Sequence, residues 1–444
     1  MIEDLRWRRL ALFSVTTLLA AAGLSACQDS PAPATAVSSA PVPVAPSPDV
    51  TAPALPRPDP AAPQSEVQAW VGQEVRAAFK AQTEGLLTGD FDRFAGAAQP
   101  GDKAVLAELQ GRFRTLRSLQ VTRFEQRIDG QPYALPKKGT WRVVHIVDHC
   151  FVDRDCAADE AVFDSFWVET AAGLRLTGFR PHDRKALCSS CQSYWTHPMS
   201  RPWETTELVA QAGARTLLAV PVKYRNRLTE LSRRAEKAAA IADHYGVGDG
   251  TVGRYLVFVA DDASWKRWYT GRPGRWVAGQ ALPTGPARIE VEVLASELTS
   301  GFADELLTHE LAHVSTLRGD SYYGRDDVWF LVEGMADYVQ KQRPGVDGYR
   351  KRYALDTLLR KRPLRSVSIK PPADDASLLD ADGRYAVGFY AVSFLFKKYG
   401  KAKTLQFFQG AVQYGIGLDG ASQSAFGKPW ATVDKESAAH IRAL

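Results

Sequence analysis

The segment Thr308-His309-Glu310-Leu-Ala-His313-Val314 lies in a stretch whose apolar spacing predicts a helix. One helical turn separates the two histidines, so both imidazoles project from the same face and can reach one cation. Glu310 is rotated by about 100° from His309 around the helix axis, so it can lie beside a metal without binding it. A base in that position can take a proton from a water molecule held by the metal. The segment therefore predicts a metal site with a general base beside it.

A second helical segment, residues 329–339, supplies a third candidate ligand, Glu333. Catalytic zinc usually has three protein ligands and one open position. Glu333 lies 20 residues after His313, which leaves room for a turn and an antiparallel helix. We therefore predict that His309, His313 and Glu333 bind one zinc ion. Asp337, one turn after Glu333, can accept the spare imidazole N–H of His309 and fix its tautomer; a solvated or capping aspartate is the alternative.

Together the two segments resemble the gluzincin metallopeptidases, in particular the bacterial peptidase MA-like proteins. The third ligand of that family lies in a Trp-x-x-Glu-Gly-x-Ala-x-Tyr-type segment, matched here by the run from Trp329 through Glu333 and Gly334 to Tyr338. This chain has one more residue between the tryptophan and the glutamate, so Phe330 can take the aromatic position. The resemblance covers roughly residues 205–440 and is strong only between 302 and 340.

The resemblance implies zinc-dependent hydrolysis of a peptide bond, with Glu310 activating zinc-bound water. It implies that the strand at 287–294 pairs with an extended peptide or protein substrate. Related gluzincins also stabilise the oxyanion with a tyrosine or histidine, and Tyr385 is our candidate, with Tyr390 behind it. The alternative is that both tyrosines pack in the core.

The N-terminus has the pattern of an export signal. Basic residues at 6–9 precede an apolar run at 10–22 and the sequence Leu24-Ser-Ala-Cys27. This ending resembles a bacterial lipobox, which implies cleavage before Cys27 and lipid attachment to its thiol. We therefore expect a lipoprotein anchored to the outer face of the bacterial cell membrane; an uncleaved anchor helix is the alternative.

The chain is expected to divide into a signal peptide at 1–26, a Pro/Ala-rich linker at 27–65, and domains at 66–202 and 203–444. In the first domain, periodicity predicts two helical stretches, followed by four strands separated by turns. This order, with Gly-Asp-Phe-Asp-Arg-Phe at 89–94, resembles the ketosteroid-isomerase-like cone fold, whose members are often binding or accessory modules. The expected elements of this domain are helices at 67–94 and 104–116 and strands at 119–128, 141–152, 161–168 and 174–179.

The second domain is expected to be α+β, with strands first and helices after. The fold class is therefore α+β throughout: a cone-shaped domain with a curled antiparallel sheet, then a zincin-like domain whose C-terminal half is mainly helical. Its expected parts are a connector at 203–221, a helix at 225–245, strands at 253–260, 276–281 and 287–294, and helices after 302.

Cys150, Cys156, Cys188 and Cys191 are expected to form two disulfides, because an even number of cysteines outside the cytoplasm favours pairing. The pairing is left open. A zinc knuckle at Cys188-Ser-Ser-Cys191 is the alternative, although the sequence has no second Cys-x-x-Cys to complete it. The histidines near these cysteines can in principle bind a second metal, but such histidines more often line strands or loops.

The net charge of +5 is mild for 444 residues, so nucleic acid is not expected as a partner. The sequence contains neither a Gly-x-Ser-x-Gly elbow nor a phosphate-binding loop with lysine, which argues against serine hydrolases and nucleotide hydrolases. We therefore predict an exported zinc metallopeptidase. A non-catalytic zinc-containing scaffold lipoprotein is the alternative, and the sequence does not predict an oligomeric state.

Overall fold

The structure is a computed structural model, and it describes residues 55–59, 61–156, 159–182, 200–247, 252–269, 274–285, 288–317, 325–341 and 348–444. The expected signal peptide, Cys27, Cys188 and Cys191 lie outside these residues. Within the described parts of the chain, no helix is both long and apolar enough to cross a membrane.

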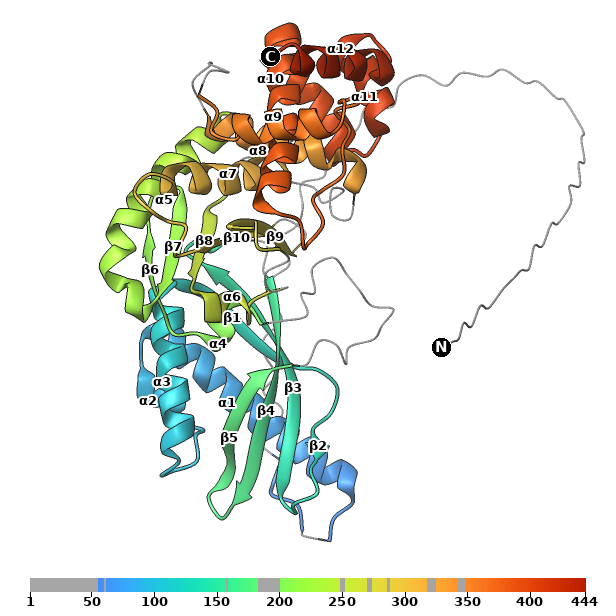
Figure 1. Ribbon diagram of the computed structural model, residues 1–444. Coiled ribbons are helices and arrows are strands. Elements are labelled where there is room, and N and C mark those ends of the chain that lie inside the picture. Colours follow the sequence, from blue (N-terminus) through green and yellow to red (C-terminus); the bar gives the residue numbers. More distant parts are fainter. Residues whose placement is uncertain are drawn as a thin grey trace, which may run out of the picture. The chain divides into compact units, whose positions relative to one another are not determined.

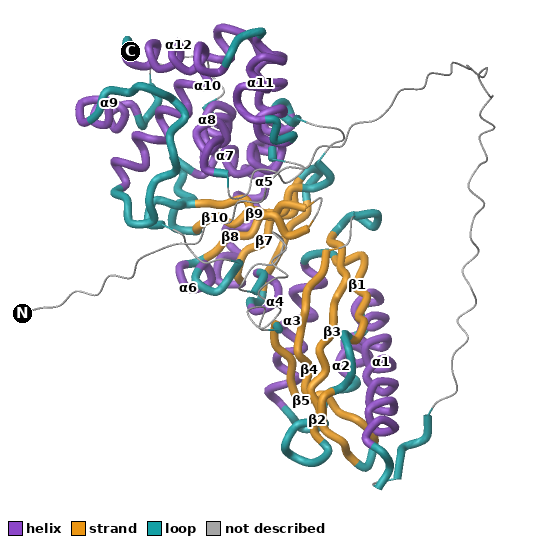
Figure 2. Tube along the Cα trace, turned by 90° about the vertical axis from the view of Figure 1, so that its right-hand side faces the viewer, coloured by secondary structure: helices purple, strands orange, loops and turns teal. Residues whose placement is uncertain are grey.

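Residues 64–182, here called the N-terminal region, consist of helices followed by an antiparallel sheet (Figures 1 and 2). Its strands lie in the order β1-β3-β4-β5, with β2 paired to β3, and helices α1 and α3 pack against the sheet. The predicted helices and strands of this region are confirmed to within a few residues, except that the short strand β2 was not predicted. The elements are α1 (Gln64–Thr88), α2 (Phe91–Ala95), α3 (Lys103–Ser118), β1 (Val121–Ile128), β2 (Tyr133–Ala134), β3 (Thr140–Phe151), β4 (Asp159–Thr170) and β5 (Gly173–Pro181).

The pair Gly89-Asp90 explains why the expected helix at 67–94 is two helices. Gly89 ends α1 in the left-handed conformation, with φ of 83°, and its N–H bonds to the carbonyl of Gly85. The side chain of Asp90 then caps α2 by accepting a hydrogen bond from the N–H of Arg93.

Cys150, which lies in β3, forms a disulfide with Cys156. The prediction of disulfides is confirmed for these two cysteines, and the structure supplies the pairing that the sequence left open. The other two cysteines lie outside the described residues, so their predicted pairing remains a prediction.

Residues 200–294 form a second sheet, with strand order β6-β7-β8-β10-β9. Strands β7, β8 and β10 are parallel, and the outer strands β6 and β9 are antiparallel to their neighbours. Helices α5 and α7 pack against this sheet. The elements are α4 (Pro202–Thr205), β6 (Leu208–Ala212), β7 (Thr216–Pro221), a 3-10 turn (Val222–Arg227), α5 (Leu228–Asp243), β8 (Tyr255–Ala260), α6 (Asp262–Trp265), β9 (Gly279–Gly285) and β10 (Arg288–Leu294).

The predicted connector at 203–221 is wrong, because it contains β6 and β7. All six residues of β7 are buried. Leu217 and Ala219 pack in a core shared with the N-terminal region, whereas Leu218 and Val220 pack against α5 and α7. A strand covered on both faces is apolar throughout and lacks the alternation by which strands are recognised.

Helix α5 lies between β7 and β8, and the short helix α6 lies between β8 and β9, so the expected order of strands first and helices after holds only from β9 onward. The strand expected at 276–281 begins and ends later, at 279–285.

The C-terminal part is helical, as predicted (Figure 1). Helix α10 lies against α8 and α9, and non-helical backbone at Gly400 interrupts it. The elements are α7 (Ala303–Thr316), a 3-10 turn (Asp326–Val328), α8 (Trp329–Gln340), α9 (Arg352–Lys361), α10 (Leu378–Phe408), a π turn (Gln409–Gln413), α11 (Gly417–Phe426) and α12 (Trp430–Arg442).

A buried ion pair joins the N-terminal region to the second sheet. Both terminal nitrogens of Arg201 donate to Asp159, at 2.5 and 2.7 Å, and one also donates to the carbonyl of Thr284 in β9 at 3.1 Å. Burial opposes ionisation of Asp159, but the charges of Arg201 and Arg288 outweigh it and lower its pKa. The pair therefore stays charged in a nearly dry environment.

Asp159→Asn should destabilise the protein by about 3–5 kcal/mol, because it leaves the buried Arg201 charge without its partner. Glu160→Gln, the control, removes an exposed partner of Arg127 and should cost less than about 1 kcal/mol. Urea unfolding measures both. Equal effects of the two substitutions would contradict this role for the buried pair.

Candidate metal centre

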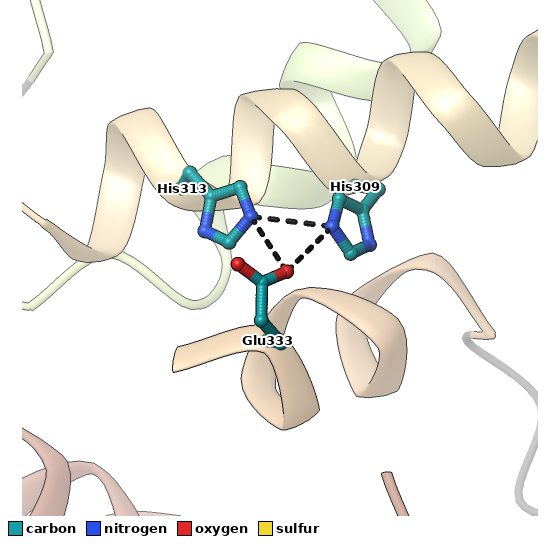
Figure 3. Close-up of side chains that lie close together, drawn as sticks. All are labelled: His309, His313 and Glu333. Carbon is teal, nitrogen blue, oxygen red and sulfur yellow. Dashed lines mark hydrogen bonds and ion pairs between the residues drawn. The ribbon is translucent and has the colours of Figure 1, made fainter. Parts of the chain in front are cut away.

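Helices α7 and α8 bring the three predicted ligands together (Figure 3). His309 and His313 project from α7 towards Glu333 on α8. Both histidines are buried, and the side chain of Glu333 is 12% exposed. Across the described residues, this is the one group of three or more His, Cys, Asp or Glu side chains arranged closely enough to hold a metal ion.

The spacing of the ligand atoms fits a tetrahedral metal. His309 Nε2 lies 3.2 Å from His313 Nε2 and 3.2 Å from Glu333 Oε2, and His313 Nε2 lies 3.4 Å from that oxygen. Zinc bonds of about 2.0–2.1 Å at tetrahedral angles place ligand atoms about 3.3 Å apart. The three atoms therefore lie close to three corners of such a tetrahedron.

Asp337 lies where the sequence predicted, 3.0 Å from Nδ1 of His309. This hydrogen bond favours the proton on Nδ1 and leaves the Nε2 lone pair for a metal. Nδ1 of His313 has no such partner among the described residues, so packing orients that ring.

The groups that hold Asp337 were not predicted. Its carboxylate accepts hydrogen bonds from the hydroxyl of Tyr349, from Nζ of Lys351 at 3.1 Å and from Nε2 of Gln340 at 2.9 Å. Tyr349 and Lys351 follow in a later segment, and no spacing rule connects them to the two motifs. They fix the aspartate, which in turn orients His309.

The electrostatics of the site favour a cation. Burial lowers the pKa of His309, but Asp337 and Glu333 outweigh burial and raise it to about 10. Burial opposes ionisation of both carboxyls, yet Lys351 and His309 lower the pKa of Asp337 to about 2, and the two histidines lower that of Glu333. Two buried carboxylates thus retain a proton on His309 when no metal is bound, and a metal ion can take over that charge.

Glu310 is buried next to the ligands, against β9. A Cβ atom on Gly279 would lie closer than 3.0 Å to the Glu310 carboxylate, so a side chain at this point of the strand would displace that carboxylate. The carboxylate has no hydrogen-bond partner among the described residues, and burial raises its pKa while His309 and His313 lower it. A raised pKa suits a general base near neutral pH.

Tyr385 lies close to the site because α8 and α10 touch through their backbones. A Cβ atom on Gly334 would lie closer than 3.0 Å to the carbonyl of Gly388, and one on Gly388 would come equally close to the carbonyl of Phe330. Tyr385, one turn before Gly388, has its ring centroid 6.1 Å from that of His309.

Tyr390, the second candidate, lies elsewhere. It is fully buried in the helical core, and its ring contacts those of Tyr349 and Phe389. Its position matches the alternative of a packed core residue.

The prediction that the strand at 287–294 pairs with substrate is wrong. Strand β10 lies between β8 and β9, so both of its edges are used. Its alternation of polar and apolar residues resembled that of a strand with one exposed face, but Glu290 and Glu292 are buried. Glu290 accepts a hydrogen bond from the hydroxyl of Tyr269, and Glu292 accepts one from Nε2 of Gln280. Among the described strands, the edge strand on this side of the sheet is β9.

Asp337→Asn should lower zinc affinity about tenfold to hundredfold, because a neutral amide no longer stabilises positive charge on His309 or fixes its tautomer. Asp382→Asn is the control, since this nearby carboxyl makes no hydrogen bond or ion pair with His309 and its substitution should leave affinity unchanged. Competition with a chromogenic chelator measures both. An unchanged zinc affinity in the Asp337 variant would show that Asp337 does not contribute to metal binding.

No known sequence family and no curated protein matches this chain. Among solved structures, native leukotriene A4 hydrolase from Saccharomyces cerevisiae matches with a TM-score of 0.28 and 15% identity, covering 47% of this chain and 33% of that one. The yeast enzyme in complex with bestatin gives 0.28 and 14%, with the same coverage. Another native yeast structure gives 0.34 and 9%, covering 73% and 67%. The chain spans about a third of the length of the first two, and scores this low do not establish a shared fold.

Proposed function

We propose that the protein is a gluzincin-type zinc metallopeptidase, in which His309, His313 and Glu333 hold one zinc ion. The observation that carries this proposal is the near-tetrahedral spacing of three buried ligand atoms, with Glu310 buried beside them. Two imidazoles and one carboxylate are a typical ligand set for catalytic zinc. Zinc binding itself does not require Glu310, so its presence favours hydrolysis over a purely structural site.

In the proposed reaction, bound zinc, Glu310 and Tyr385 each have a separate role. Bound zinc would polarise the scissile carbonyl and lower the pKa of a water molecule. Glu310 accepts a proton from the attacking water and passes it to the leaving amine. The hydroxyl of Tyr385 donates a hydrogen bond to the oxyanion that develops on the substrate.

The proposed substrate is an extended peptide or unfolded protein segment. An extended chain can add to the edge of β9 through main-chain hydrogen bonds. The same strand carries Gly279, which contacts Glu310, so a peptide on this edge would pass beside the general base.

We infer the domain division and location from the sequence. Residues 66–202 would be a ketosteroid-isomerase-like cone domain and residues 203–444 the peptidase domain. Export as a lipoprotein anchored through Cys27 is supported by the N-terminal pattern, and the Cys150–Cys156 disulfide suits an oxidising compartment.

Glu310 and Glu333 should respond differently to substitution. Glu310→Gln should keep stoichiometric zinc and a normal melting temperature while losing on the order of a hundredfold or more in peptide cleavage. Glu333→Ala should bind zinc more weakly and melt at a lower temperature, because bound metal stabilises only the folded state.

Glu305→Gln, one turn before His309 on the same helix, is the matched control and should change neither property. Metal analysis, thermal melts and cleavage of unfolded protein with and without a chelator measure all three variants. Loss of zinc from Glu310→Gln, or wild-type cleavage by it, would reject the mechanism. If the wild-type protein binds zinc but cleaves no unfolded protein, the result would instead favour the alternative of a non-catalytic scaffold lipoprotein that contains zinc.

Cys27→Ala should release the protein from membranes or stall its processing, because the thiol that receives the lipid is gone. Ser30→Ala should leave both unchanged. Membrane fractionation and the mass of the mature N-terminus measure the outcome. Normal signal cleavage with unchanged membrane retention in the Cys27 variant would contradict a lipid anchor.

A further inference from the structure

Positive charge is concentrated in the last part of the chain. Residues 348–444 contain 16 lysines and arginines and 8 acidic residues, a net charge of +8, whereas the whole chain has a net charge of +5. Within this part, residues 350–370 contain eight basic residues and one acidic residue. Apart from Lys351, which holds Asp337, the metal centre uses none of these basic side chains. A local excess of this kind is typical of a surface that meets an anionic partner.

Five exposed basic residues form one cluster, here called the basic patch. Helix α9 ends at Lys361, and the segment that follows it lies beside the end of α12 (Figures 1 and 2). A hydrogen bond from the side chain of Arg442, the last residue of α12, to the carbonyl of Leu364 joins the two. The basic patch consists of Arg360, Lys361, Arg362, Arg365 and Arg442.

The charges of the basic patch are not neutralised within the protein. Among the described residues, no carboxylate pairs with any of its five side chains. Arg360 donates to the hydroxyl of Thr357 at 2.9 Å, and Arg442 donates to a backbone carbonyl, so both keep their full charge. The one acidic residue of α9, Asp356, pairs with Arg352 at 3.0 Å. Five like charges on one surface repel one another, and an anionic partner relieves that repulsion.

Exposed apolar side chains accompany these charges. Tyr353, which is 69% exposed, lies two helical turns before Arg360 and therefore on the same face of α9. Leu355, on the opposite face, is fully buried, and α9 packs against α10. Leu444, two residues after Arg442, is 39% exposed. Cations interspersed with aromatic and aliphatic side chains are typical of a surface that lies on a membrane.

We propose that the basic patch binds the surface of a membrane containing anionic phospholipids, with headgroup phosphates on its cations and Tyr353 in the interfacial layer. Guanidinium groups pair well with phosphates, and a membrane presents many phosphates in one plane. The apolar layer beneath the headgroups also accommodates the exposed tyrosine, whereas an acidic polymer would match only the charges. The inference depends neither on the proposed peptidase activity nor on the proposed lipid anchor.

The test uses residues 28–444, produced without a lipid, because they include every residue that the structure describes. Sedimentation with vesicles measures binding to pure phosphatidylcholine and to phosphatidylcholine with about 30% phosphatidylglycerol. The protein should bind the anionic vesicles at least about tenfold more tightly than the neutral ones. Raising the salt concentration from about 0.05 M to about 0.5 M should weaken binding to the anionic vesicles, because salt screens the charges.

The double variant Arg362→Gln/Arg365→Gln should weaken binding to the anionic vesicles at least about tenfold. The control is Arg76→Gln/Arg154→Gln, which removes two exposed arginines of the N-terminal region that form no ion pair with any described residue. It lowers the net charge equally and should change vesicle binding less than about twofold. All four arginines are exposed, so thermal melts should show that both variants fold normally.

Tyr353→Ser tests the apolar part of the surface and should weaken binding to the anionic vesicles at least about threefold. Polyglutamate, added as a competitor without an apolar layer, represents an acidic polymer as the partner. Equal binding to neutral and anionic vesicles, or equal weakening by the two arginine double variants, would overturn the proposal. Tight binding of polyglutamate with no binding to either vesicle would also overturn it and favour an acidic polymer.

Discussion

The structure depends on holding three electron-rich atoms within 3.4 Å of one another in a buried site. Nitrogen lone pairs and a carboxylate oxygen repel at this distance unless a proton or a cation lies between them. The protein maintains the arrangement through α7 and α8, whose contacting faces are almost entirely buried. Asp337 then fixes His309, and its own hydrogen bonds to Tyr349, Lys351 and Gln340 fix Asp337.

Two further elements reach this centre through glycines. Helix α10 approaches α8 where Gly334 and Gly388 permit backbone contact, and this brings Tyr385 towards His309. Strand β9 approaches α7 where Gly279 leaves space for the carboxylate of Glu310. In the same strand, the carbonyl of Thr284 accepts a hydrogen bond from Arg201, which also pairs with Asp159 in the N-terminal region. The N-terminal region is thus connected, through one strand, to the surroundings of Glu310.

The grouping of His309, His313 and Glu333 could be predicted because local rules determine it. The spacing of His309 and His313 places both rings on one face of a helix, and the chemistry of zinc requires a third ligand. The helices and strands of the N-terminal region also followed from periodicity and from turn residues such as Gly89. Tyr349, Lys351 and Gly279 could not be predicted, because each acts through a contact with a distant segment that leaves no pattern in the sequence. Strand β7 was not predicted, because it is apolar on both faces and shows no alternation. Strand β10 was wrongly predicted to pair with substrate, because its residues alternate although its glutamates are buried.

The central claim is that one zinc ion is bound by two imidazoles and a carboxylate. X-ray absorption at the zinc edge of the purified full chain tests this claim most directly, because it identifies the coordinating atoms. We predict one zinc per chain with only nitrogen and oxygen neighbours at about 2.0–2.2 Å, including scattering from two imidazole rings. Sulfur neighbours at about 2.3 Å would show that cysteines bind the metal and would contradict the account. A purified chain that retains no zinc would also contradict it.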